Sequence, residues 1–180
     1  LKIAALNAIS STLLSNGRYK IIEDADPIDL LDLTPEKTVT IVGAFQSYIQ
    51  KISKSGNRLF VVEFNEHALH EEHKRYYVPA SDFKKVIPGS DIVIITGLTL
   101  VNHTIDELLE TVTPGTKTIV TGPSSSIIPD ILFKNKVNII GATRFFNPEL
   151  IFPIVSEFGT GFHLFKYCAQ KICILNEPNE

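Results

Sequence analysis

Residues 90–109 read SDIVIITGLTLVNHTIDELL, and residues 117–133 read KTIVTGPSSSIIPDILF. Each stretch begins with a short apolar run rich in β-branched residues, breaks at a Thr-Gly pair, and passes through small polar residues into a helical pattern. Apolar runs of this length are typical of parallel strands that helices cover on both faces. The polar residues then follow the carboxyl ends of the strands, where open α/β sheets bind ligands.

The same alternation of strands and helices extends to both sides of these units. The predicted strands are residues 38–42, 59–63, 75–78, 91–96, 118–120, 137–140 and 172–175. We therefore expect an α/β fold, with a mostly parallel, three-layer Rossmann-like sheet, helices on both faces and strand order 3-2-1-4-5-6. In that order the loops at Gly43 and Gly97 flank one crevice, and Gly43, Phe45 and Gly97 are candidate ligand-binding residues there.

The composition limits the classes of partner. The net charge is −3 and no basic run is interleaved with aromatic residues, so nucleic acid is not an expected partner. The longest apolar runs have the length of strands, and no signal-peptide pattern is present, so no membrane partner is expected. Two cysteines, Cys168 and Cys173, are too few for a disulfide framework and predict buried thiols in a cytoplasmic protein.

The first residues predict a helix over 1–15, ending at Asn16-Gly17. Its apolar face is expected to contain Ile3, Leu6, Leu13 and Leu14. Such a helix must pack on something, so we expect a homo-oligomer through this helix or through the exposed face of the pocket.

The turn after the first predicted strand resembles a mononucleotide-binding unit in its spacing. Gly43 follows the strand, and Glu63 ends the next strand 20 residues later, where dinucleotide folds place an acid on a ribose hydroxyl. The turn has one glycine instead of G-x-G-x-x-G, and Phe45 stands where a second glycine would admit a pyrophosphate. A standard NAD site is not expected, and a smaller ligand stays open.

Two later loops offer polar ligand-binding groups. Asn102 and Thr104 precede a predicted helix, although Thr104 also fits a capping box with Glu107. Gly122, Ser124 and Ser125 open the helix predicted at 127–133, where free N–H groups and hydroxyls suit an anion. Capping and a tight turn explain the same serine loop without a ligand.

The histidines are the candidate metal ligands. His67, His70 and His73 recur at three-residue steps among glutamates, which would place them on one face of a helix, and His103 lies in a polar loop. The alternative interpretation of residues 66–73 is a solvated polar helix or loop without a metal.

Several short motifs carry a resemblance to a known family. They are VGAF at 42–45, DIVIITG at 91–97 with Asn102 and Thr104, TGPSS at 121–125 with Pro129, and Gly141-Ala142. In this order and spacing, from about residue 38 to 174, the chain resembles the heavy-metal chelation family, formerly a domain of unknown function. The resemblance implies a Rossmann-like domain preceded by a small domain similar to the enolase N-terminal domain, with a site between the two. Residues 1–33 would then be a helical segment linked to an upstream domain, and 34–180 the Rossmann-like domain.

Three functions follow from these features. The first is binding or handling of a small anionic ligand or metal chelate in the crevice, with a transition-metal ion or its chelate as the group bound. The second is an enzyme that uses a nucleotide or S-adenosyl cofactor, with Glu63 on the ribose. The third is a non-catalytic domain that oligomerises or binds a partner. The sequence leaves open whether any reaction is catalysed.

Overall fold

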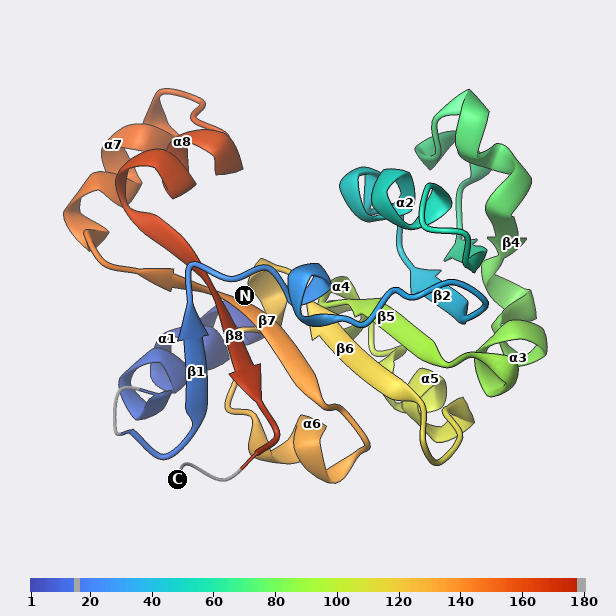
Figure 1. Ribbon diagram of the computed structural model, residues 1–180. Helices are drawn as coiled ribbons and strands as arrows, with labels where there is room; N and C mark the ends of the chain where they lie inside the picture. Colours follow the sequence, from blue (N-terminus) through green and yellow to red (C-terminus); the bar gives the residue numbers. More distant parts are fainter. Residues whose placement is uncertain (15–16, 178–180) are drawn as a thin grey trace.

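The computed structural model describes residues 1–14 and 17–177 and contains one eight-stranded sheet with helices around it (Figure 1). The strands are β1 (Lys20–Glu23), β2 (Thr38–Val42), β3 (Arg58–Glu63), β4 (Tyr77–Pro79), β5 (Ile92–Thr96), β6 (Lys117–Thr121), β7 (Ile139–Phe145) and β8 (Ala169–Leu175). The α-helices are α1 (Lys2–Leu14), α2 (Gln46–Ser53), α3 (Phe83–Val86), α4 (Leu98–Val101), α5 (Ile105–Thr111), α6 (Asp130–Lys134), α7 (Ile151–Ser156) and α8 (Gly161–Tyr167). The 3₁₀ turns are η1 (Pro27–Leu30), η2 (Glu66–Ala68), η3 (Glu71–Tyr76), η4 (Ala80–Asp82), η5 (Ile87–Gly89), η6 (Pro123–Ser125) and η7 (Pro148–Leu150).

The strand order is β1-β8-β7-β6-β5-β2-β3-β4. Strands β2 to β7 pair in parallel, whereas β8 is antiparallel to β7 and β1 is antiparallel to β8. This order differs from the predicted 3-2-1-4-5-6, because the sheet continues past β7 into two antiparallel strands and β1 was not predicted. The α/β class and the mostly parallel, Rossmann-like sheet are confirmed.

Two separate apolar cores lie on the two faces of the sheet. On one face, α2 buries Tyr48, Ile49 and Ile52 against β2 and β3. On the other, α5 and α6 contribute Leu108 and Leu132, among other residues, to the larger core. Both faces of the central strands are therefore covered, which explains why these strands are almost entirely apolar. Figure 1 shows α2 and α5 on opposite sides of the strands.

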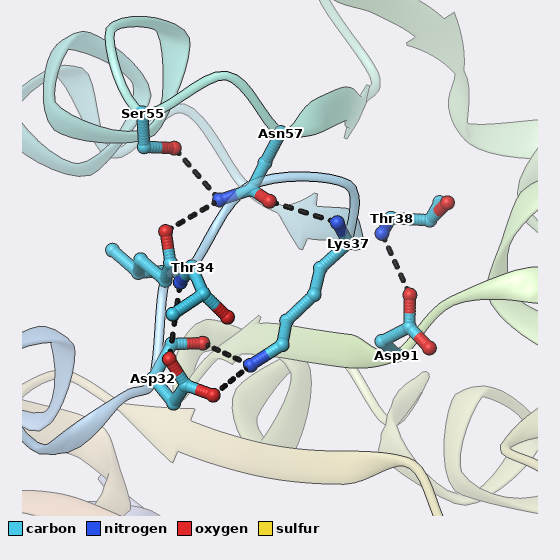
Figure 2. A network of polar contacts seen from close by, with 8 residues as sticks. Asp32, Thr34, Lys37, Thr38, Ser55, Asn57 and Asp91 are labelled. Atoms are coloured by element: carbon cyan, nitrogen blue, oxygen red, sulfur yellow. Dashed lines mark hydrogen bonds and ion pairs between the residues drawn. The ribbon is translucent and has the colours of Figure 1, made fainter.

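A polar network fixes the register of the first parallel strands at their amino-terminal ends (Figure 2). Asp91 accepts a hydrogen bond from the backbone N–H of Thr38 at 2.7 Å, and Asn57 accepts one from the backbone N–H of Lys37 at 2.9 Å. Lys37 in turn pairs with Asp32. The network satisfies backbone groups that begin the ladder, so it is structural and lies at the end of the sheet opposite to the expected ligand loops.

The N-terminal helix packs by only part of the face predicted, because Leu14 is buried as expected but two other leucines are not. Ser10 and Leu14 are its buried residues, whereas Leu6 and Leu13 are 49% and 45% exposed, so the prediction for those two leucines is wrong. Asn7 anchors the packed side, because its amide donates to the carbonyl of Pro123 at 2.9 Å. The predicted helix end at residues 15–16 lies outside the described residues, and the homo-oligomer expected through this helix stays a prediction.

The chain leaves the body of the sheet between β7 and β8. Helices α7 and α8 lie at the end of this two-stranded ribbon, away from the other helices in Figure 1, and neither contains a buried residue. Several of their aromatic side chains, including Phe152 and Phe162, are exposed. Among the helices of the described ranges, none is long and apolar enough to cross a membrane.

Candidate functional site

A cleft of about 550 Å³ lies at the carboxyl ends of the central parallel strands. We call it the switch-point cleft, because β2 and β5 are the adjacent strands from which the chain proceeds in opposite directions along the sheet. Its walls come from the ends of β2, β3 and β5, the segment from β4 to α3, and the segment from α4 to α5. Its lining residues are Val42, Gly43, Val62, Glu63, Phe64, Tyr77, Pro79, Ala80, Ser81, Phe83, Thr96, Leu98, Thr99, Asn102, Thr104, Glu107 and Leu108.

Gly43 forms the floor of the cleft where β2 ends. Its φ of +107° favours glycine, and a Cβ there would lie 3.1 Å from the side chain of Thr96. Its N–H donates to the carbonyl of Val62 at 2.9 Å. The Gly43 N–H is therefore used within the sheet and is not available to a ligand. The nucleotide-cofactor hypothesis stays a prediction.

Glu63 lies at the cleft with one carboxylate oxygen already engaged. Its Oε1 accepts hydrogen bonds from the backbone N–H groups of Phe64 at 2.7 Å and Asn65 at 3.4 Å. These bonds hold the carboxylate at the end of β3 and leave Oε2 as the oxygen available to a ligand.

Asn102 and Thr104 also line the cleft, as a bonded pair. The Oδ1 of Asn102 accepts from the Thr104 hydroxyl at 2.7 Å and from its backbone N–H at 3.3 Å. The predicted capping box is wrong, because the Thr104 hydroxyl makes no cap hydrogen bond and its backbone is helical instead of extended.

Glu107 faces the cleft and pairs with Lys84 at 2.7 Å. Sequence analysis missed this role, although its spacing from Thr104 placed both on one helix face.

The chemistry of the cleft is that of oxygen acceptors and hydroxyls between apolar walls. Carboxylates come from Glu63 and Glu107, and hydroxyls come from Ser81, Thr96 and Thr99 in addition to Thr104 and Tyr77. Among the lining residues that the structure describes, none is a lysine, arginine, histidine or cysteine. The cleft can therefore accept hydrogen bonds from a neutral or positively charged ligand. The Glu63 carboxylate opposes an anion, whereas the charge of Glu107 is paired with Lys84.

Phe45 is predicted as a site residue, but it does not line the cleft. Its ring stacks on Tyr48 with a centroid separation of 5.3 Å and packs against the core on the α2 face. Phe45 directly precedes α2, so packing accounts for its position.

The predicted residues Gly97, Gly122, Ser124 and Ser125 form a packed corner beside the cleft, and none of them lines it. The Gly97 N–H donates to the carbonyl of Thr121 at 2.8 Å, and the Ser125 hydroxyl lies 2.6 Å from two carbonyl oxygens, those of Gly122 and Gly141. The helix predicted from residue 127 begins at Asp130, with the short turn η6 before it. The helix N-terminus on which the anion prediction depended is therefore absent at the serines.

A second hollow, of about 810 Å³, separates α1 from η6 and the end of β7. Asn7, Ser126, Thr143 and Arg144 line it. The Oδ1 of Asn7 is buried and has no hydrogen-bond partner within the described ranges, and Arg144 forms an ion pair with Glu23. This hollow has the basic residue that the cleft lacks.

Of the four candidate histidines, the structure brings two together. His70 and His73 lie beside Glu72 in and next to η3, with one ligand atom from each residue within 4.8 Å of the others. His67 belongs to the separate turn η2 and is not part of this group, and His103 is exposed in the loop between α4 and α5.

Comparisons with known proteins give the fold independent support. The model of the family described as "Putative heavy-metal chelation" matches residues 26–174. A protein of unknown function from Pyrococcus horikoshii is 21% identical, with a TM-score of 0.81 over 96% of this chain and 66% of its own. One from Desulfitobacterium hafniense DCB-2 is 21% identical, with a TM-score of 0.78 over 97% of this chain and 67% of its own. This chain thus spans about two thirds of either protein. A search of curated proteins found no match.

Proposed function

The chain belongs to the family described as "Putative heavy-metal chelation", and from this premise we propose that it binds a metal ion as a complex with a small organic chelator, in the switch-point cleft. The observation that carries the proposal is the convergence of Gly43, Glu63, Asn102 and Thr104 on one cleft at the ends of three parallel strands. A volume of about 550 Å³ is suited to a small organic molecule and exceeds what a bare ion requires.

The types of side chain that line the cleft favour a chelate over a free heavy-metal ion as the ligand. Soft and borderline metal ions prefer thiolate and imidazole ligands, and the described lining of the cleft contains neither. A chelator would supply those donor atoms itself. The protein would then recognise the organic shell, and at most add an oxygen ligand from Glu63 or Glu107.

The cleft residues divide this recognition between shape and hydrogen bonding. Val62, Phe64 and Leu98 provide apolar surface for the body of the chelator. Glu63 and Glu107 would accept hydrogen bonds from N–H or O–H groups on its rim, and Glu63 would attract a positive charge. The proposal therefore specifies a neutral or cationic complex in place of the anionic ligand expected from the sequence.

Calorimetry and thermal-shift measurements with complexes of different charge test the proposal. The panel contains Ni²⁺ or Co²⁺ bound by 2,2′-bipyridine, which is neutral without metal, the same ions bound by EDTA, and each chelator without metal. We expect saturable binding of the cationic complexes, little binding of the anionic EDTA complexes, and weaker binding of the metal-free chelators.

Variants of α5 provide a matched pair for the same assay. Glu107→Gln removes a carboxylate that faces the cleft, whereas Glu110→Gln removes an exposed carboxylate that does not line it. Loss of a charged hydrogen-bond partner costs about 1.5–3 kcal/mol, so Glu107→Gln should weaken binding by roughly 10- to 100-fold and Glu110→Gln should not. Equal affinities for the two variants, or no binding of any complex, would contradict the proposal.

A further inference from the structure

We propose that His70, Glu72 and His73 form a second site, separate from the cleft, that binds one divalent transition-metal ion directly through protein ligands. The three residues belong to the segment that joins β3 to β4, and none of them lines the switch-point cleft. The site uses the imidazole donors that the cleft lacks. It is independent of the proposed function, because it takes the ion itself and requires no chelator.

The distances between the candidate ligand atoms are close to those between ligand atoms around a bound zinc ion. Nε2 of His73 lies 3.5 Å from Oε1 of Glu72. Two ligand atoms on a tetrahedral zinc ion are about 3.3 Å apart, because each bond is about 2.0–2.1 Å long. One ligand atom from each of the three residues lies within 4.8 Å of the other two. His70 and Glu72 are exposed, so rotation of their side chains can close the remaining gap.

The local backbone explains why two of the three regularly spaced histidines meet. Residues 71–76 form the 3₁₀ turn η3, and His70 is its N-cap. A 3₁₀ helix has three residues per turn, so side chains three residues apart eclipse each other. The rings of His70 and His73 are accordingly nearly parallel, at 11°, with centroids 6.1 Å apart. His67 is excluded because extended backbone at Leu69 separates its turn from η3.

The burial of His73 points to a ligand that the described protein groups do not supply. Its side chain is 7% exposed, yet Nδ1 has no hydrogen-bond partner within the described ranges, and Nε2 contacts Glu72 at the outer limit of hydrogen bonding. A metal ion on Nε2 would bond directly to the nitrogen that now makes only this long contact, and it would also orient Glu72.

The charges around the cluster favour a cation. Residues 66–75 contain three glutamates, one lysine and one arginine, and the nearby ammonium of Lys74 is already paired with Glu71 at 2.6 Å. Two imidazoles and one carboxylate are a ligand set for Zn²⁺ and its neighbours in the first transition series, and three protein ligands leave coordination positions for water.

Titration of the untagged 180-residue chain with ZnCl₂ and CoCl₂ tests this site. We expect one metal ion per chain by calorimetry, and Co²⁺ should acquire the visible absorption of a protein-bound ion. His70→Ala and Glu72→Gln alter exposed ligands and should leave folding intact. Each should weaken binding by at least about 10-fold, because loss of even an outer-shell partner typically costs about 10- to 100-fold in metal affinity.

Two neighbouring substitutions serve as matched controls. His67→Ala removes an exposed imidazole from η2, and Glu66→Gln removes an exposed carboxylate from the same turn. Both should retain wild-type affinity. Absence of Zn²⁺ and Co²⁺ binding, or equal affinities in His70→Ala and His67→Ala, would overturn the site. Binding of a preformed chelate by His70→Ala would still support the cleft, so the two proposals can fail separately.

Discussion

Replacing Gly97 with alanine tests whether the loop after β5 is a packing element or part of a ligand site. A Cβ at this position would lie 2.8 Å from the backbone nitrogen of Ser125 and 3.2 Å from its Cβ. The first distance is about 0.6 Å shorter than the 3.4 Å at which ordinary van der Waals contact begins. Ser125 cannot move away easily, because it is buried and its hydroxyl donates a hydrogen bond to the carbonyl of Gly141 in β7.

The expected cost follows from this overlap. An extra carbon in a well-packed region typically destabilises a protein by about 1–3 kcal/mol. The clash is with a backbone atom, so we expect a loss of about 2 kcal/mol in the free energy of unfolding. For a domain of this size that loss lowers Tm by about 4–8 °C.

Thermal unfolding followed by circular dichroism measures the effect. Gly89→Ala is the control, because a Cβ at Gly89 has nothing within 4 Å and should leave Tm within about 1 °C of the wild type. A Gly97→Ala protein with unchanged Tm would refute the packing argument. If Tm were unchanged but chelate binding were lost, Gly97 would be assigned to the ligand site.

Three further predictions concern stability and reactivity. Burial alone would raise the pKa of Asp26, but its hydrogen bonds, chiefly from Lys171, lower that pKa below the usual value. Its stabilising contribution should be complete above about pH 4 and disappear as the pH falls through the lowered pKa, so Asp26→Asn should flatten acid unfolding curves there. Burial raises the pKa of the Cys173 thiol to about 12, so Ellman's reagent should modify it at pH 8 only after unfolding. Gly141→Ala should destabilise by at least about 2 kcal/mol in urea titrations, because the new Cβ would overlap Thr121 and Pro27.

The parallel part of the fold could be predicted because its evidence is local. Runs such as residues 92–95 are apolar throughout, and burial on both faces is the simplest reason for that pattern. Strand β1 has no such signal, since it is four residues long and begins and ends with a charged residue. Its position depends on β8, which is far away in the sequence, so no local pattern could have revealed it.

The sequence predicted the cleft residues correctly where the ends of strands determine their positions, and less well where loop packing does. Glu63 and Asn102 line the cleft because they follow strands that lie close together in the sheet. Ser125 illustrates why other residues were misplaced. A glycine and serine loop has the same composition whether its hydroxyls meet a ligand or a neighbouring carbonyl, and here Ser125 meets the carbonyls of Gly122 and Gly141. Only the packing of β6 against β7 distinguishes the two cases.

The pairing of β1 with β8 also constrains the order of folding. Lys20 lies opposite Leu175 and Glu23 opposite Ile172, so roughly 150 residues separate the paired positions. A chain synthesised from its amino end cannot place β1 until β8 has left the ribosome, whereas β2, β3 and β5 can pair earlier. Closing so long a loop is slow, so the amide protons of β1 should be among the last to gain protection in pulse-labelled refolding. Until then the outer edge of β8 stays open to pairing with another chain.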